Sequence, residues 1–246
     1  MRELIRCWQH TRMIVLIALC AALYVAVLLP FKIVSIVPGI TEIRPGAALP
    51  VFFSIFFGPA AAWGACFGNT IGDVLGGTIG PGTIAGFFGN FLYGFVPYRI
   101  LRAFSKSQEE LFSIKGGSVL VFAIILASAL CALPIALGVD LIGFPFDLVV
   151  HTIFLNNVLV SVVLVPLLIK ALGKRIRGMK LTYEQLLQPE EISGSNRIGP
   201  VIVLGLILII YAMMMIPSLH ATIPVGKNVF QIASALVLFL ATLFLI

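Results

Sequence analysis

Long apolar runs constrain this chain more than any other feature. Several of them approach or reach the roughly 18 to 20 residues that cross about 30 Å of hydrocarbon; they are residues 13–29, 117–137, 148–169, 200–216 and 229–246. Hydrophobic residues make up 60% of the chain and charged residues 11%, which is far from the balance of a soluble globular domain. The sequence therefore predicts an all-α integral membrane protein.

The first apolar run follows Arg2, Arg6 and Arg12, a pattern that also begins signal peptides. Its apolar part extends to about residue 29, which is longer than the usual core of a signal peptide, and Pro30-Phe31-Lys32 offers no small-residue cleavage site. We therefore expect a retained first helix.

The cysteines contain no C-x-x-C pair, and all except Cys7 lie inside apolar segments (Cys20, Cys66 and Cys131). Such spacing indicates neither a disulfide framework nor a zinc site. We expect no metal and no cofactor.

The net charge of +6 raises the possibility of nucleic-acid binding, but the position of the charges argues against it. Most basic residues form three clusters: Arg2, Arg6 and Arg12; Arg99, Arg102, Lys106 and Lys115; and Lys170, Lys174, Arg175, Arg177, Lys180 and Arg197. Basic clusters beside membrane spans are typical of cytoplasmic segments. We expect all three clusters, and therefore the N-terminus, to be cytoplasmic.

This orientation predicts a bundle of six membrane-spanning helices. The helix over 13–34 leaves the cytoplasm, so the segment from Ile43 to Arg99 has to return to it and crosses an odd number of times. One crossing is too few for more than 50 mostly apolar residues, so three are expected. The predicted helices are 13–34, 43–58, 59–77, 83–102, 117–138 and 148–172, with a break at Phe57-Gly58-Pro59. The helix over 43–58 spans only about 24 Å, so neighbouring helices must shield its ends.

The rest of the chain predicts an addition to this bundle. Residues 178–198 are polar and indicate a cytoplasmic linker, and two further apolar helices follow at 199–217 and 228–246. We interpret residues 1–177 as a substrate-binding bundle and residues 199–246 as an accessory transmembrane hairpin. No internal repeat is evident, which argues against an inverted-repeat secondary transporter.

Polar side chains occur at similar depth on several predicted helices, near the outer ends. Asn69 and Asp73 lie one turn apart, beside a ladder formed by Gly64, Gly68, Gly72 and Gly76 on which another helix can approach closely. The other members of this group are Asn90, Asn156, Asn157 and Arg44, and His151 enters from the same side. Polar groups inside a membrane are costly unless they face a cavity or one another.

Two interpretations of these residues remain open. They either hydrogen-bond the helices together, with Arg44 as an interfacial anchor, or line a ligand pocket open to the outside. Convergence in depth favours the pocket for the group, whereas His151 alone is better explained as a satisfied or interfacial histidine. Ala18, Ala22 and Ala26 form a small-residue stripe that suits helix packing, either within the protein or against a partner.

No motif for energy coupling or hydrolysis is present. The chain has no G-x-x-x-x-G-K-[ST] phosphate loop, no H-E-x-x-H and no G-x-S-x-G sequence. We therefore expect no enzyme and no ATP hydrolysis by this chain itself.

Residues 12–175 resemble the substrate-binding S components of energy-coupling-factor transporters, nearest to the branch that includes queuosine-precursor transporters. The resemblance rests on six helices with both ends inside, on Ala18/Ala22/Ala26, and on the run from Arg44-Pro45 through Phe57-Gly58-Pro59 to Gly68-Asn69 and Asp73. It implies a prokaryotic plasma membrane and capture of a small vitamin-like molecule near the outer helix ends. It also implies that the alanine stripe contacts a transmembrane coupling (T) subunit driven by two ATPases.

Two other functions remain as alternatives. One is a lipid-modifying membrane enzyme, which requires Asp73, His151 and Arg44 to meet within hydrogen-bonding reach. The other is a non-transporting membrane scaffold, in which the polar residues serve only to hold the helices together.

Overall fold

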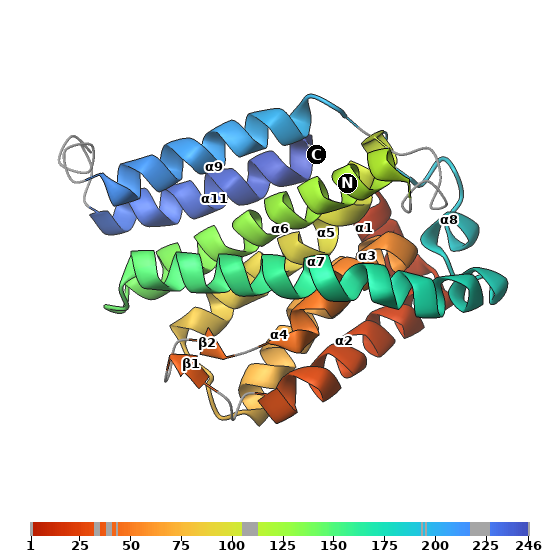
Figure 1. Ribbon diagram of the computed structural model, residues 1–246, viewed down its shortest axis with the longest axis horizontal. Coiled ribbons are helices and arrows are strands. Elements are labelled where there is room, and N and C mark those ends of the chain that lie inside the picture. The colour runs from red at the N-terminus through yellow and green to blue at the C-terminus, as the bar shows by residue number, and fades with distance from the viewer. Residues whose placement is uncertain are drawn as a thin grey trace.

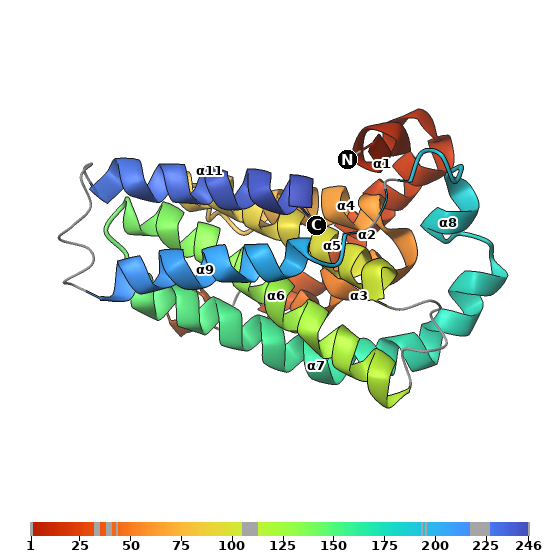
Figure 2. The same ribbon diagram turned by 90° about the horizontal axis from the view of Figure 1, so that it is seen from above.

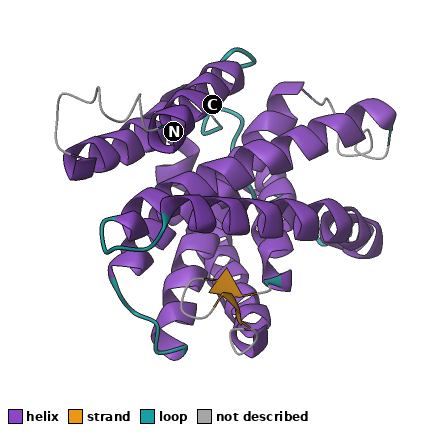
Figure 3. Cartoon of the chain, turned by 60° about the vertical axis from the view of Figure 1, so that its left-hand side comes forward, coloured by secondary structure: helices purple, strands orange, loops and turns teal. Residues whose placement is uncertain are grey.

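A computed structural model describes residues 2–31, 35–37, 41–42, 44–104, 113–192, 194, 196–216 and 227–245. Apart from one pair of short strands, the regular structure in these ranges is helical (Figure 3), so the predicted helical fold is confirmed. The elements are α1 Arg2–Arg6, η1 Cys7–Gln9, α2 Thr11–Phe31, β1 Ser35–Val37, β2 Thr41–Glu42, η2 Pro45–Ala47, α3 Ala48–Phe57, α4 Pro59–Leu75, α5 Pro81–Phe104, α6 Ile114–Asp140, α7 Phe146–Gly178, α8 Tyr183–Leu186, α9 Gly199–Met215 and α11 Lys227–Leu245.

The long helices run roughly along the longest axis of the molecule (Figure 1). Helices α2 to α7 pack on one another in a bundle, and α9 and α11 lie side by side on the face formed by α6 (Figure 2). Strands β1 and β2 pair antiparallel, with Ser35 opposite Glu42.

Helix α3 is shorter than the predicted helix 43–58. It begins at Ala48, after the 3-10 turn η2, and ends at Phe57, so it rises only about 15 Å. All of its residues except Leu49 are buried, and it packs against α4, α5 and α7. Neighbouring helices therefore provide the shielding that the sequence requires for this segment.

The break between α3 and α4 lies at Gly58, as predicted. Gly58 has a φ of +51°, a conformation that side chains with a Cβ rarely adopt, and Pro59 begins the next helix. A Cβ at Gly58 would also lie 2.7 Å from Cγ of Tyr183, the first residue of α8. Glycine is therefore needed both for the backbone turn and for the contact with the linker.

The glycine ladder of α4 packs against α2. A Cβ on Gly64 would lie 2.4 Å from Cβ of Cys20, and one on Gly68 would lie 2.9 Å from the Tyr24 ring. At Gly72 the Leu28 side chain would be 2.6 Å away. The ladder thus brings the backbones of α2 and α4 together, as small residues do in membrane helices.

Three helical stretches among the described residues are long and apolar enough to cross a membrane: Thr11–Phe31, Lys115–Asp140 and Phe146–Leu186. Shorter apolar helices cover Pro45–Phe57, Gly199–Met215 and Val229–Phe244. The number of crossings, six in the bundle plus two in the hairpin, stays a prediction.

Figure 1 shows α1, α8 and the C-terminal end of α7 at one end of the molecule. The last turn of α1 carries Arg6, and that of α7 carries Arg175 and Arg177. Arg99 of α5 donates to the Glu3 carboxylate at 3.0 Å and to the Gly194 carbonyl at 2.7 Å. Arg197 donates to the Ala103 carbonyl at 2.9 Å. These bonds attach the N-terminus and the 178–198 segment to the same end of α5. Lys106, also assigned to this end, lies outside the described residues.

Two polar contacts attach the C-terminal hairpin to the bundle at the opposite end. His151 Nε2 of α7 lies 2.8 Å from the Tyr211 hydroxyl of α9, and the two rings meet edge to face. Gln231 of α11 donates from Nε2 to the carboxylate of Asp140, the last residue of α6. The hairpin therefore has a defined position on α6 and α7.

Candidate functional site

A small polar cavity lies among α2, α5, α6 and α7, beneath the segment that begins at Arg44. It encloses about 10 Å3 and is lined by Tyr24, Arg44, Asn90, Cys131, Ile135, Ile153, Asn156 and Asn157. Four of the residues proposed from the sequence as ligand-binding thus lie together. Asn90 and Asn157 are buried, whereas Arg44 and Asn156 are partly exposed.

Asn90 is held by hydrogen bonds on both sides of its amide. The Tyr24 hydroxyl donates to Asn90 Oδ1 at 3.1 Å, and Asn90 Nδ2 donates to the Gly86 carbonyl at 2.8 Å. These bonds orient the amide and link α2 to α5. Asn90 therefore has a structural role in addition to any contact with a ligand.

Asn156 is held much more weakly. Its Oδ1 accepts one hydrogen bond from the Arg44 backbone N–H at 3.4 Å, near the long limit for such a bond. Its Nδ2 makes no hydrogen bond within the described part of the chain. This amide therefore keeps most of its hydrogen-bonding capacity for another molecule.

A buried network of hydrogen bonds between α5 and α7 lies next to the cavity. The Tyr93 hydroxyl lies 2.8 Å from Ser161 Oγ and 3.4 Å from the Asn157 carbonyl oxygen. Ser161 Oγ in turn donates to the Ala47 carbonyl at 3.3 Å. The network connects the 3-10 turn η2 to α7, next to the cavity.

Asn69 and Asp73 lie beside this cavity rather than in its lining. Asn69 Nδ2 donates to Asp73 Oδ2 at 3.3 Å, the contact expected for residues one turn apart. A Cβ on Gly86 would lie 2.8 Å from Asn69 Nδ2, so the Asn69 amide packs directly on the turn of α5 that also binds Asn90. The pair is therefore adjacent to the cavity residues.

The alanine stripe lies on a different surface. Ala18, Ala22 and Ala26 are exposed on α2, and together with Ala21 and residues of α4 they line a shallow groove of about 610 Å3. The opposite face of α2, with Cys20 and Tyr24, packs on the α4 glycines. The stripe does not take part in the contact between α2 and α4, and it is therefore accessible to a partner helix.

His151 does not join the cavity residues. Its Nδ1 lies 2.6 Å from the Asp147 carbonyl and its Nε2 2.8 Å from the Tyr211 hydroxyl, so both ring nitrogens have partners elsewhere. The arrangement of Asp73, His151 and Arg44 required for the enzyme alternative is not formed. In the described residues no group of three or more His, Cys, Asp or Glu side chains lies close enough to hold a metal ion.

Sequence reasoning gave no specific role to Tyr24, Tyr93 or Ser161. Tyr24 was identifiable only as an aromatic residue that can line a pocket, yet it packs on Gly68 and orients Asn90. Its spacing from the α4 glycines becomes informative only once α2 is known to pack there. Ser161 gave no signal, because serine is common in membrane helices.

A predominantly helical chain with apolar helices of membrane-spanning length and a polar cluster enclosed between them has the architecture of an integral-membrane protein. A family model described as QueT transporter matches residues 14–174. The chain therefore belongs to the QueT transporter family, a family of energy-coupling-factor S components for queuosine-precursor uptake, and is a transporter component rather than an enzyme. No curated protein and no solved structure matches the chain.

Proposed function

We propose that this chain is the substrate-binding subunit for uptake of a queuosine precursor or a similar vitamin-like molecule. Residues 1–177 form the binding bundle, residues 178–198 a cytoplasmic linker and residues 199–246 an accessory hairpin. The observation that carries the proposal is the meeting of Arg44, Asn90 and Asn156 at one polar cavity inside a member of a transporter family.

The chemistry of the cavity suits a hydrogen-bonding heterocycle. Asparagine amides offer a donor and an acceptor side by side, which complements the alternating donors and acceptors on the edge of a base-like ring. Asn90, Asn156 and Asn157 supply three such amides, and Arg44 adds a planar cation that can stack on a ring or bind a polar substituent. Asn69 and Asp73 extend this polar region on the α4 side.

A base-like heterocycle is larger than this cavity, so the cavity has to open before such a ligand can bind. The enclosed volume of about 10 Å3 holds no more than about one water molecule, whereas small-molecule sites occupy roughly 300 Å3 or more. The segment from Arg44 to Ala47 is joined to α7 by two long hydrogen bonds, at 3.4 and 3.3 Å. Each such bond contributes about 0.5–1.5 kcal/mol, and we propose that displacement of this segment opens the cavity to a ligand.

The exposed stripe of Ala18, Ala22 and Ala26 is the proposed contact for the T subunit, through which two ATPases supply the energy. Its small side chains and shallow groove allow a partner helix to approach the α2 backbone closely. The stripe and the cavity involve different faces of α2, so ligand capture and subunit coupling are separable. The basic end of the bundle faces the cytoplasm of a prokaryotic cell, and the cavity lies toward the outside.

The experiment is to purify the protein from cells under gentle conditions and identify any co-purified small molecule by mass spectrometry. We expect a queuosine precursor or a related heterocycle in near-stoichiometric amount. The proposal fails if no small solute co-purifies and none of the queuosine precursors binds to the purified protein.

A further inference from the structure

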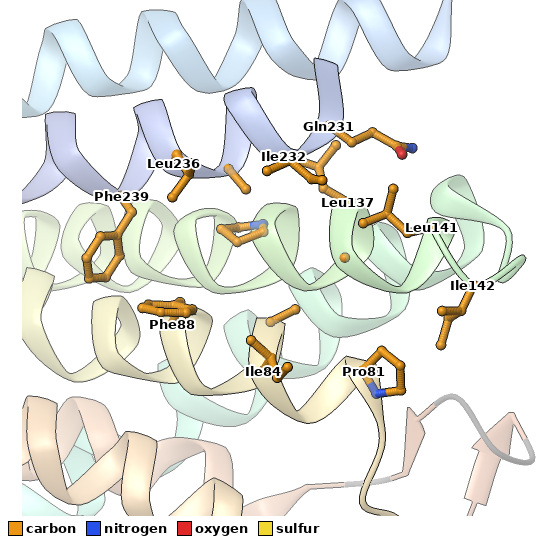
Figure 4. Close-up of a pocket in the computed structure, with 14 residues that line it drawn as sticks. Pro81, Ile84, Phe88, Leu137, Leu141, Ile142, Gln231, Ile232, Leu236 and Phe239 are labelled. Carbon is orange, nitrogen blue, oxygen red and sulfur yellow. The ribbon is translucent and has the colours of Figure 1, made fainter. Parts of the chain in front are cut away.

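A second cavity lies where the C-terminal hairpin meets the bundle, away from the polar cavity. It has a volume of about 440 Å3, within the range of small-molecule sites, and is lined by residues of α5, α6 and α11 (Figure 4). Small residues of all three helices leave the space open: Ala85, Gly138 and Ala235. Gly138 and Ala85 also bring α5 and α6 together, because a Cβ on Gly138 would lie 2.4 Å from the Ala85 Cβ.

The lining is apolar except at one end, where Gln231 lies. Gln231 is 1% exposed, and its Nε2 donates to the Asp140 carboxylate. Its Oε1 is buried and accepts no hydrogen bond from any described residue. Buried acceptors are normally paired, so this oxygen indicates an occupant that donates a hydrogen bond.

The opening of this cavity is bordered by exposed apolar side chains. Ile84, Ile232 and Leu236 belong to its lining and are each more than half exposed, which gives the opening an apolar rim. A water-soluble ligand gains nothing from such a rim, whereas a bilayer lipid can enter sideways.

The cavity also has its polar and apolar parts in the order in which a bilayer lipid has them, with the polar end near the ends of the helices. Gln231 and Asp140 lie near the ends of their helices, at the level expected for headgroups, while Phe239 lies at the opposite end of the cavity (Figure 4). Phe239 is eight positions after Gln231, which corresponds to a rise of about 12 Å along α11. A headgroup beside Gln231 therefore places its acyl chain along the apolar lining, toward the middle of the membrane.

We propose that this cavity binds a bilayer lipid whose headgroup donates a hydrogen bond to Gln231 Oε1, with one acyl chain between α5, α6 and α11. The neighbouring Asp140 carboxylate favours a positively charged donor. The primary ammonium of phosphatidylethanolamine is such a donor, whereas the quaternary ammonium of phosphatidylcholine carries the same charge but no N–H. These two lipids with identical acyl chains thus form a matched pair of probes.

The test measures lipid retained by the whole chain in native mass spectrometry, after exchange into nanodiscs that contain equal amounts of the two lipids. We expect the wild-type protein to retain phosphatidylethanolamine about threefold to tenfold more than phosphatidylcholine, the effect of one hydrogen bond. Gln231→Leu keeps the side-chain volume but removes the acceptor, and should abolish this preference. Equal retention of the two lipids by the wild-type protein, or an unchanged preference in Gln231→Leu, would overturn the proposal.

Ala235→Phe tests the cavity without altering Gln231, because the larger ring fills the space between the helices. Its matched control is Ala233→Phe on the same helix, where Ala233 is exposed and does not line the cavity. We expect Ala235→Phe to lose bound lipid of both kinds and Ala233→Phe to retain it. Equal retention by the two variants would show that lipid binds elsewhere on the protein and would refute the assignment.

Discussion

Two asparagines of the polar cavity should respond differently to substitution, because one is held in place and the other is not. The Asn90 amide makes two buried hydrogen bonds, at 3.1 and 2.8 Å, and removing it in Asn90→Ala leaves buried polar groups without these partners. The expected loss is about 1–3 kcal/mol in the free energy of unfolding. Among the described residues Asn156 accepts one hydrogen bond, at 3.4 Å, and it is partly exposed, so Asn156→Ala should cost less than about 1 kcal/mol.

The effects of the two substitutions on ligand affinity should not follow the same order as their effects on the free energy of unfolding. If Asn156 contacts the ligand, its loss removes a hydrogen bond of about 0.5–1.5 kcal/mol, which weakens binding by about twofold to tenfold. The assay is equilibrium binding of a queuosine precursor to the purified variants, together with thermal unfolding in the same detergent. Leu155→Ala is the control, since Leu155 is the preceding residue on α7 and is 53% exposed away from the cavity.

Two results would contradict these expectations. If Asn156→Ala binds the ligand as tightly as Leu155→Ala does, Asn156 serves only to hold Arg44. If Asn156→Ala also lowers the unfolding temperature as much as Asn90→Ala, the cavity residues act to join helices, as a scaffold requires.

Three other variants or measurements address separate parts of the structure. Ala22→Leu should preserve ligand binding but abolish co-purification with the T subunit, and loss of binding with normal folding would contradict the separation of the two surfaces. Glu3→Gln should lower the free energy of unfolding by about 3–5 kcal/mol, because Arg99 would keep a buried charge without its carboxylate; an unchanged unfolding temperature would argue against this pair. Burial raises the pKa of the Cys7 thiol to about 12, so maleimide should label it at pH 8 only after denaturation, and rapid labelling of the folded protein would exclude the buried position.

The sequence predicted the helices and the turn between α3 and α4 because apolar length and Gly58-Pro59 act locally. It also identified the α4 ladder as a surface for close packing, which proves to be the contact with α2. Spacing along a helix shows which residues share a stripe but not which way the stripe is turned. For this reason Asn69 and Asp73 were grouped correctly with each other, while their position beside the cavity lining could not be predicted.

Other features depend on contacts between segments far apart in the chain. The 3-10 turn before α3 contacts α7 through Ala47 and Ser161, which are separated by more than a hundred residues. The contact of Gln231 with Asp140 likewise requires the hairpin to lie on α6. A glutamine and an aspartate far apart in the sequence give no sign that they are partners. The position of the hairpin and the second cavity could therefore not be derived from the sequence.

The measurement that tests the central claim most directly is the binding of a queuosine precursor to the purified chain in detergent, without any ATPase or T subunit. Isothermal titration calorimetry gives the stoichiometry and the affinity in one experiment. The account predicts saturable binding of one ligand per chain, weakened in Asn156→Ala and unchanged in Ala22→Leu. Absence of binding by the folded chain, or binding that is indifferent to both Asn90 and Asn156, would contradict it.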